Sequence, residues 1–201
     1  HALDVSKTAE THYTRTFDWD IAKTARDEFG AEIFELGPLM PGMPGMAEYE
    51  VSVFTTGSTD ADWSVSGVIT VTNPAPIAAI LTGVSDIVSP DIAAQVDCGE
   101  EVTFPYTLDA ATGDDEAELT CTYAADLPNA DARTNTATAT LANQRWSWVA
   151  GEGDSEGSVE PSPLMDEDEA VTTDFTGTAE VTFGDPEMID ACVDVSDLFG
   201  A

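Results

Sequence analysis

Basic side chains are what this sequence holds least of. Only six of its 201 residues are Lys or Arg, against 39 Asp or Glu, so the formal net charge is −33 at pH 7. Proteins that bind nucleic acid neutralise phosphates with clustered Lys and Arg. The chain has no such cluster, so we expect no nucleic acid among its partners.

An apolar run long enough to cross a bilayer, about 20 residues in a helix, is also lacking. We therefore expect no membrane span in the mature chain. Because the sequence begins at His1 rather than Met, it predicts a removed signal peptide and a secreted, extracellular or cell-surface protein. The alternative is that His1 is a cloning remnant.

Cysteine occurs only three times, at Cys98, Cys121 and Cys192. Structural disulfides persist in oxidising compartments, which agrees with secretion. A bridge between Cys98 and Cys121 would close a loop of ordinary size and stabilise the fold by about 3 kcal/mol. Cys192 is then left over, either free and buried or paired outside this chain.

Residues for catalysis are sparse as well. Gly153–Gly157 reads Gly-Asp-Ser-Glu-Gly, which formally matches a nucleophile elbow, but its flanks form an acidic loop instead of a strand and a helix. The only histidines are His1 and His12, and the neighbouring carboxylates would oppose an oxyanion. We therefore interpret Ser155 as a loop serine and expect neither an enzyme nor a cofactor.

Carboxylates form three clusters, which raises the question of calcium. The clusters are Asp60 with Asp62, 114–116 and 166–169. Calcium needs several oxygen ligands on a turning backbone, and no segment matches the loop of the helix–loop–helix calcium sites. Salt-adapted surface charge is the interpretation we favour, with calcium binding left open. No Cys–His spacing fits zinc, so we predict no metal site.

Strand-forming sequence, by contrast, is abundant. From Leu3 to Ile21 the odd positions are mostly apolar and the even positions are polar or small, which is the period of two of a half-buried strand. The run is too long for one ordinary strand. We therefore expect a break near Thr8–Thr11, with a short first strand and a longer second one.

Val, Thr, Ile and aromatic residues fill ten further segments that Gly, Pro, Asn and Asp separate. These predicted strands are Tyr49–Thr55, Trp63–Thr72, Val84–Val88, Val102–Leu108, Leu119–Tyr123, Arg133–Leu141, Trp146–Val149, Val171–Phe175, Ala179–Phe183 and Cys192–Val195. Only Asp27–Leu36 suggests a short helix. Many short strands at regular spacing predict an all-β sandwich or barrel, and we favour an Ig-like or jelly-roll-type β-sandwich with long loops.

Two segments interrupt the strand pattern. Gly37–Met46 is a run of Pro, Gly and Met. It is either a plain surface loop or a loop that docks on a neighbouring subunit through Met40, Met43 and Met46, since Met packs adaptably. Gly151–Ala170 is rich in Gly, Ser, Pro and acids, which predicts a solvated loop.

Several phrases resemble the Ig-like β-sandwich repeats of secreted prokaryotic cell-surface proteins, in an acidic, halophile-type version. The phrases are VSKTAETHYTRTFDWDIAKTA, DADWSVSGVITVTNPAPIAA, DCG, FPYTL, LTCTYAADLPNADARTNTATAT and VDVSD. The resemblance covers roughly residues 3–141 and 178–198. It implies a sandwich in which a disulfide between Cys98 and Cys121 ties two strands, a surface role and no catalytic residues.

The composition and the resemblance support two function hypotheses. The first is a structural subunit of an extracellular filament, pilus or surface layer in a halophilic microbe. The alternative is an adhesin-type binding module of a larger surface protein. In either case we expect a single sandwich domain over residues 10–201 with insertions at 37–46 and 144–170, preceded by an N-terminal extension at 1–9.

The few cations are unevenly placed. Four of the six fall in the first 26 residues together with four acids, so that stretch is neutral while the rest of the chain carries the whole charge of −33. A neutral strand approaches a strongly acidic neighbour with little repulsion, and Leu3, Val5 and Lys7 share one face of it. We therefore predict that 1–9 is a donor strand that completes the sheet of the next copy, giving a head-to-tail homopolymer.

The alternative is an ordinary first strand in the protein's own sheet. If 1–9 is donated to another copy, the cations at odd-numbered positions are expected to pair with carboxylates along the boundary between the two copies. These cations are Lys7, Arg15 and Lys23.

The charge generates a first testable prediction. Raising NaCl from about 0.1 to 2 M should raise the free energy of unfolding steeply, because the screening length falls to about 3 Å near 1 M salt. Thermal melts followed by circular dichroism would measure this. A melting temperature that stays constant over that range would contradict the interpretation of the charge as salt adaptation.

Overall fold

The computed structural model describes residues 2–34, 41–42, 45–113, 115–143, 145–150, 159–164 and 171–197, with the backbone alone described for 145–150 and 159–164. In these residues all regular structure is β-strand, which confirms the predicted all-β class. Among them, accordingly, no helix is long and apolar enough to cross a membrane.

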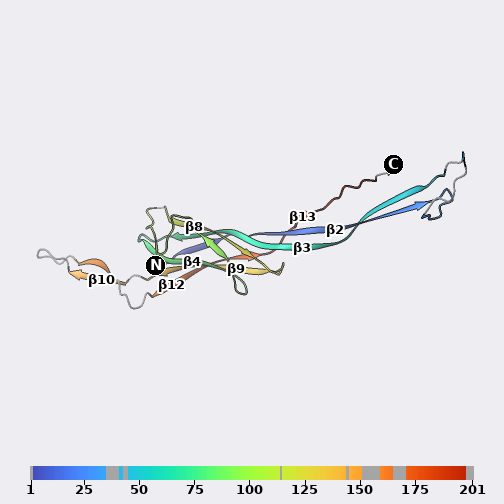
Figure 1. Cartoon of the computed structure of the whole chain (residues 1–201). Helices are drawn as coiled ribbons and strands as arrows, with labels where there is room; N and C mark the ends of the chain where they lie inside the picture. The colour runs from blue at the N-terminus through green and yellow to red at the C-terminus, as the bar shows by residue number, and fades with distance from the viewer. Residues whose placement is uncertain are drawn as a thin grey trace. The chain divides into compact units, whose positions relative to one another are not determined.

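Thirteen strands follow one another along the described chain (Figure 1). They are β1 Asp4–Lys7, β2 Glu10–Arg26, β3 Glu48–Asn73, β4 Ala79–Val88, β5 Ile92–Ala93, β6 Gln95–Asp97, β7 Tyr106–Leu108, β8 Ala117–Asp126, β9 Arg133–Ala142, β10 Arg145–Ala150, β11 Val159–Leu164, β12 Thr172–Val181 and β13 Glu187–Ile189. Sheet A has the order β13-β2-β3-β8-β6, with β1 also paired to β3. Sheet B has the order β12-β9-β4-β5, with β7 also paired to β4, and β10 pairs with β11 alone.

The chain divides into two compact units. Unit 1 comprises His1–His12 and Asp62–Gly184, and unit 2 comprises Tyr13–Ala61 and Asp185–Ala201. The divisions fall inside β2 and β3, so both strands contribute to both units. Unit 1 holds the β-sandwich, in which the two sheets pack against each other around one hydrophobic core.

Strict alternation along the central strands builds the core of unit 1. In β8 every second residue from Leu119 to Ala125 is buried, as is Leu127 directly after it, and β9 repeats the pattern from Asn135 to Leu141. Successive side chains of a strand point to opposite faces, so each strand presents one dry face to the other sheet. The largest apolar side chains that are fully buried come from strands of both sheets and are Val65, Ile69, Val71, Leu81, Val88 and Val181.

Strand β1 completes the sandwich from within the same chain. It pairs antiparallel with β3 from Asp4, opposite Thr72, to Lys7, opposite Ile69. Leu3 is 4% exposed and belongs to the core. The break between β1 and β2 falls at Thr8–Ala9, inside the predicted interval. In the single chain β1 therefore takes the position of an ordinary first strand, and its donation to another copy stays a prediction.

Two glycines allow the backbone of β1 to lie close to both sheets. At Gly67 of β3, a Cβ would collide with the carbonyl oxygen of Thr8 and lie 2.9 Å from Cε1 of Tyr123. At Gly177 of β12, a Cβ would collide with the carbonyl oxygen of Val5 and lie 2.8 Å from its carbonyl carbon. Glycine is required here by the closeness of another backbone, since neither position has a positive φ.

Two predicted strand breaks are wrong, because the strands continue through polar residues in one case and through a glycine in the other. Strand β12 runs through Gly177 without interruption, whereas the sequence predicted two strands on either side of it. Strand β3 likewise continues through 56–62, between the predicted Tyr49–Thr55 and Trp63–Thr72. Polar residues are tolerated there because every residue of 56–62 is exposed.

The predicted helix at Asp27–Leu36 is also wrong within its described part, 27–34. The carboxylate of Asp27 accepts hydrogen bonds of 2.9 Å from the N–H groups of Phe29 and Ala31. These bonds hold the chain in a turn, a common competitor of helix formation for Asp. Arg26 and Glu32 then form an antiparallel bridge across that turn.

Three further element predictions need correction. Residues 192–195 form no strand, and β13 lies just before them. Only Tyr106–Leu108 of the predicted Val102–Leu108 is a strand, since Pro105 has no N–H to give to a ladder. The segment predicted as a loop at Gly151–Ala170 contains β11, which pairs with β10; 151–158 and 165–170 lie outside the described residues.

The close approach of β1 yields a second prediction. Gly67→Ala and Gly177→Ala should each lower the free energy of unfolding by roughly 3 kcal/mol, because a methyl group in these positions overpacks the backbone of β1. Gly83→Ala in β4 is the matched control, since a Cβ there meets nothing within 4 Å. Chemical denaturation measures all three, and equal effects at the three positions would contradict the packing described.

Candidate functional site

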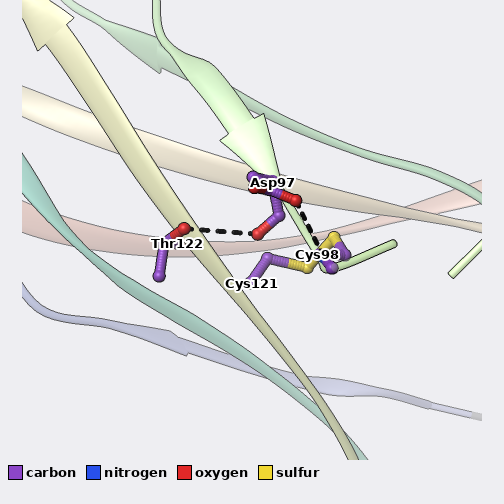
Figure 2. Close-up of a disulfide and its surroundings, with 5 residues drawn as sticks. Asp97, Cys98, Cys121 and Thr122 are labelled. Carbon is purple, nitrogen blue, oxygen red and sulfur yellow. Dashed lines mark hydrogen bonds between the residues drawn. A yellow bond between two sulfur atoms is a disulfide. The ribbon is translucent and has the colours of Figure 1, made fainter. Parts of the chain in front are cut away.

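The predicted disulfide is present and joins two neighbouring strands of unit 1. Cys98 directly follows β6, and Cys121 lies in β8, where Asp97 is opposite Thr122. The hydroxyl of Thr122 donates to the carbonyl oxygen of Asp97 at 3.4 Å, beside the bridge (Figure 2). The predicted pairing is thus confirmed, and Cys192 is free as expected but exposed rather than buried.

Of the three methionines predicted to contact a neighbouring subunit, the structure describes only Met46. Met40 and Met43 lie outside the described residues. Met46 is 72% exposed. Docking of this loop on a neighbouring subunit therefore stays a prediction.

Three of the four cations of the N-terminal stretch, Lys7, Arg15 and Lys23, pair with carboxylates of their own chain. In unit 2 the guanidinium of Arg15 donates two hydrogen bonds to Asp60, at 2.6 and 2.7 Å, and hydrogen bonding to Arg15 lowers the pKa of Asp60. Lys23 pairs with Asp197 at 2.9 Å. Such exposed pairs contribute little to stability, and they leave these cations already matched in the single chain.

Lys7 differs from the other cations because its partner lies inside the sandwich. It comes from β1 of sheet A and pairs with Asp86 of β4 in sheet B, and both side chains are 0% exposed. Burial lowers the pKa of Lys7, although the hydrogen bond and the charge of Asp86 act in the opposite direction. The ion pair thus connects the two sheets through a place where solvent is excluded.

The ring of Tyr123 packs against Lys7 in this buried site. The ammonium nitrogen of Lys7 lies 3.9 Å from the centroid of its ring, a cation–π distance. Its hydroxyl donates to the carbonyl oxygen of Thr8 at 2.6 Å. Burial raises the pKa of Tyr123, the nearby amide of Asn135 lowers it and the charge of Asp86 raises it. Tyr123 is therefore close to all three of the other polar side chains.

Asn135 is the fourth member of the site. It is 0% exposed and lies on β9 opposite Val88, while Asp86 lies opposite Ala137. The inward faces of β4 and β9 therefore carry Asp86 and Asn135 one diagonal step apart. We name the group of Lys7, Asp86, Tyr123 and Asn135 the buried polar cluster.

The buried polar cluster is incompletely satisfied. Within the described residues, neither the oxygen nor the nitrogen of the Asn135 side chain has a hydrogen-bond partner of good geometry, and the second carboxylate oxygen of Asp86 has none either. Asn73, equally buried, is different: its amide donates to the carbonyl oxygens of Ile77 and Asp109 at 2.9 and 2.7 Å. A buried polar group without a partner costs about 1–3 kcal/mol, so these unpartnered atoms lower the stability of the sandwich.

Sequence reasoning identified Lys7 but missed Asp86 and Asn135. Both residues could have been noticed from their place in the alternation, because each lies at a position of its strand where the pattern predicts a buried apolar residue. Lys7 shares the face of Leu3 and Val5 in the same way. Three polar residues in the core phase of three strands are a detectable pattern once the strands are aligned.

The other predicted features give no site. Among the described residues no group of three or more His, Cys, Asp or Glu has the geometry to hold a metal ion. Asp114, Ser155 and the acids at 166–169 lie outside the described residues, so calcium binding there is untested.

Comparisons with protein-family models, with curated proteins and with solved structures find no match to this chain. The resemblance to surface-protein repeats therefore stays a prediction, and the buried polar cluster has to be interpreted from its own chemistry.

The cluster yields a third prediction. Asp86→Leu should lower the free energy of unfolding by about 3–5 kcal/mol, because it leaves the Lys7 amine buried without its carboxylate. The double variant Lys7→Met with Asp86→Leu should be less destabilised than Asp86→Leu, since it removes both charges. Denaturant titration of the single and double variants measures the difference. A double variant that loses the sum of the two single effects would show that the charges do not interact.

Proposed function

We propose that this protein is a structural subunit of an extracellular filament, pilus or surface layer in a salt-adapted microbe, and that copies of it join by strand addition. The observation that carries the proposal is the construction of unit 2, a strand ribbon that exposes its apolar residues. The charge composition and the disulfide agree with a secreted protein in high salt.

Unit 2 has almost no core of its own. Of the described hydrophobic residues that are buried, only Tyr13 belongs to it. Among its described residues, eleven large hydrophobic side chains are exposed: Ile21, Phe29, Phe34, Met46, Tyr49, Val51, Phe54, Met188, Ile189, Val193 and Val195. Monomeric proteins rarely expose so many apolar side chains in one region, and such regions mark interaction surfaces.

The strands of unit 2 also leave backbone groups open for pairing. β2 and β3 are neighbours in sheet A, but β13 pairs only with Thr14–Thr16 of β2. On β3, β8 pairs only with Ser64–Asn73, which lies in unit 1. Within the described residues, most of the outer edges of this ribbon therefore have no strand partner, and open edges accept strands of another chain.

Charge decides under which conditions copies can meet. Unit 2 contains 14 acids and three bases, a formal charge of −11. At low salt two such units repel each other, whereas at molar salt the repulsion is screened beyond about 3 Å. Assembly of this kind is accordingly a high-salt process.

Strand addition has two possible routes. Donation of 1–9 requires that β1 leave the sheet in which it lies and exchange with the β1 of another copy. Addition at the open edges of β2 and β3 requires no exchange, and we favour it for that reason.

The proposal yields a fourth prediction. In about 2 M NaCl the wild-type protein should form fibres or sheets, and in low salt it should stay monomeric because of charge repulsion. The variant Ile21→Lys with Val51→Lys, which places charge at two exposed apolar residues of unit 2, should stay monomeric in both. Sedimentation velocity and electron microscopy would measure assembly.

The matched control is Ile77→Lys with Ile87→Lys, which adds the same charge at residues of unit 1 that are about half exposed, at 49% and 48%. It should assemble like the wild type. A synthetic peptide of residues 1–9 should block assembly only if β1 is exchanged. A wild-type protein that stays monomeric at every salt concentration would sink the proposal.

A further inference from the structure

The buried polar cluster brings an amine and a carboxamide into one closed site. The Lys7 amine has no exposed surface, lies over the ring of Tyr123 and contacts Asp86. Asn135 is equally buried and lies beside the hydroxyl side of the same tyrosine. These groups come from β1, β8, β4 and β9, so the closure of the sandwich itself assembles them.

The amine of Lys7, the carboxamide of Asn135 and the carboxylate of Asp86 each have surroundings that favour a reaction between the amine and the carboxamide. Burial favours the neutral, nucleophilic form of the Lys7 amine. The carboxamide of Asn135 has no hydrogen-bond partner of good geometry among the described residues that would hold it in its unreacted form. Asp86 contacts the amine through one oxygen and keeps its second oxygen unpartnered among the described residues, so that oxygen is available to carry a proton.

We propose that Lys7 and Asn135 form an intramolecular isopeptide bond, in which the amine nitrogen of Lys7 replaces the amide nitrogen of Asn135, with Asp86 as the proton carrier. The inference is independent of the proposed function, because it concerns unit 1 alone and needs no second copy.

The reaction balances without any further reactant. The lone pair of Lys7 Nζ attacks Cγ of Asn135, and a tetrahedral intermediate forms. Asp86 takes a proton from Nζ and gives one to Nδ2, so that the bond between Cγ and Nδ2 breaks and ammonia leaves. The product is a secondary amide between Nζ and Cγ, Asp86 is again a carboxylate, and nothing is oxidised or reduced.

The site also has features that favour the product. Because both groups lie in one site, the reaction is unimolecular and avoids the entropic cost of bringing two molecules together. Exclusion of water protects the carboxamide from hydrolysis to Asp during the reaction. The bond would fasten β1 of sheet A to β9 of sheet B, which makes exchange of β1 between copies impossible after it forms.

The fifth prediction is tested by the intact mass of the full-length protein. Mass spectrometry after reduction of the disulfide should give a mass lower than that of the sequence by one ammonia. Because an Asn that cyclises to a succinimide loses the same mass, proteolytic mapping must also show one peptide that contains Lys7 joined to one that contains Asn135. Joined peptides that contain Lys7 and Asp86 with loss of water, or a mass equal to that of the sequence, would overturn the assignment.

Variants separate the roles of the three residues. Lys7→Arg and Asn135→Ala each remove a reacting group, and Asp86→Asn removes the proton carrier while keeping its size. In all three variants, proteolytic mapping should find no peptide in which residues 7 and 135 are covalently linked. Asn143→Ala is the matched control, because Asn143 is an exposed amide that bonds Thr173, and it should be joined like the wild type. Circular dichroism shows whether each variant is folded; a folded Asp86→Asn protein that is joined as completely as the wild type would contradict the role of Asp86.

Discussion

The sandwich of unit 1 depends on the burial of one charged strand. β1 inserts between glycines of both sheets, and its Lys7 then has no water to solvate its amine. Burying an ion is so costly that the site must supply a counter-charge, and Asp86 and the ring of Tyr123 do so from opposite sheets. Gly67 lets the tyrosine lie across β3, so the same residue that admits β1 also places the ring under the amine. The core, the first strand and the polar cluster are therefore one arrangement, in which a change at any member disturbs the rest.

The sequence predicted those parts of the fold that follow from local pattern. Alternation in the first 21 residues located both strands and the break at Thr8–Ala9, and the cysteine spacing with the resemblance located the disulfide. It failed where tertiary contact overrules local preference. The segment around Gly177 was predicted to separate two strands, yet Gly177 lies inside β12, where it pairs with Ala137 of β9 and the carbonyl of Val5 lies close to it. Asp86 and Asn135 could not be linked to Lys7, because nothing in a single sequence shows that β4 and β9 face β1 across the core.

The placement of the cations answers a question that composition alone raised. A chain with so few bases keeps several of them near its N-terminus, and three of these bind carboxylates of the same chain: Lys7 inside the sandwich of unit 1, Arg15 and Lys23 on the surface of unit 2. The two kinds of pair differ in their response to salt. Screening weakens the exposed pairs of unit 2 and leaves the enclosed pair of unit 1 nearly unchanged. High salt thus relieves the repulsion between acidic surfaces without loosening the pair that fastens β1.

The position of β1 in the chain sets the order in which the sandwich can form during synthesis. β1 is made first, but Asp86 follows Lys7 by 79 residues, and the glycine of β12 that receives Val5 is made later still. Every contact that holds β1 is therefore long-range, and closing such contacts is slow. Until β12 has left the ribosome, β1 lacks one of the strands that it packs against, so the sandwich of unit 1 stays open until then. An open chain is the form in which a polypeptide can be threaded through a narrow pore before it folds on the other side.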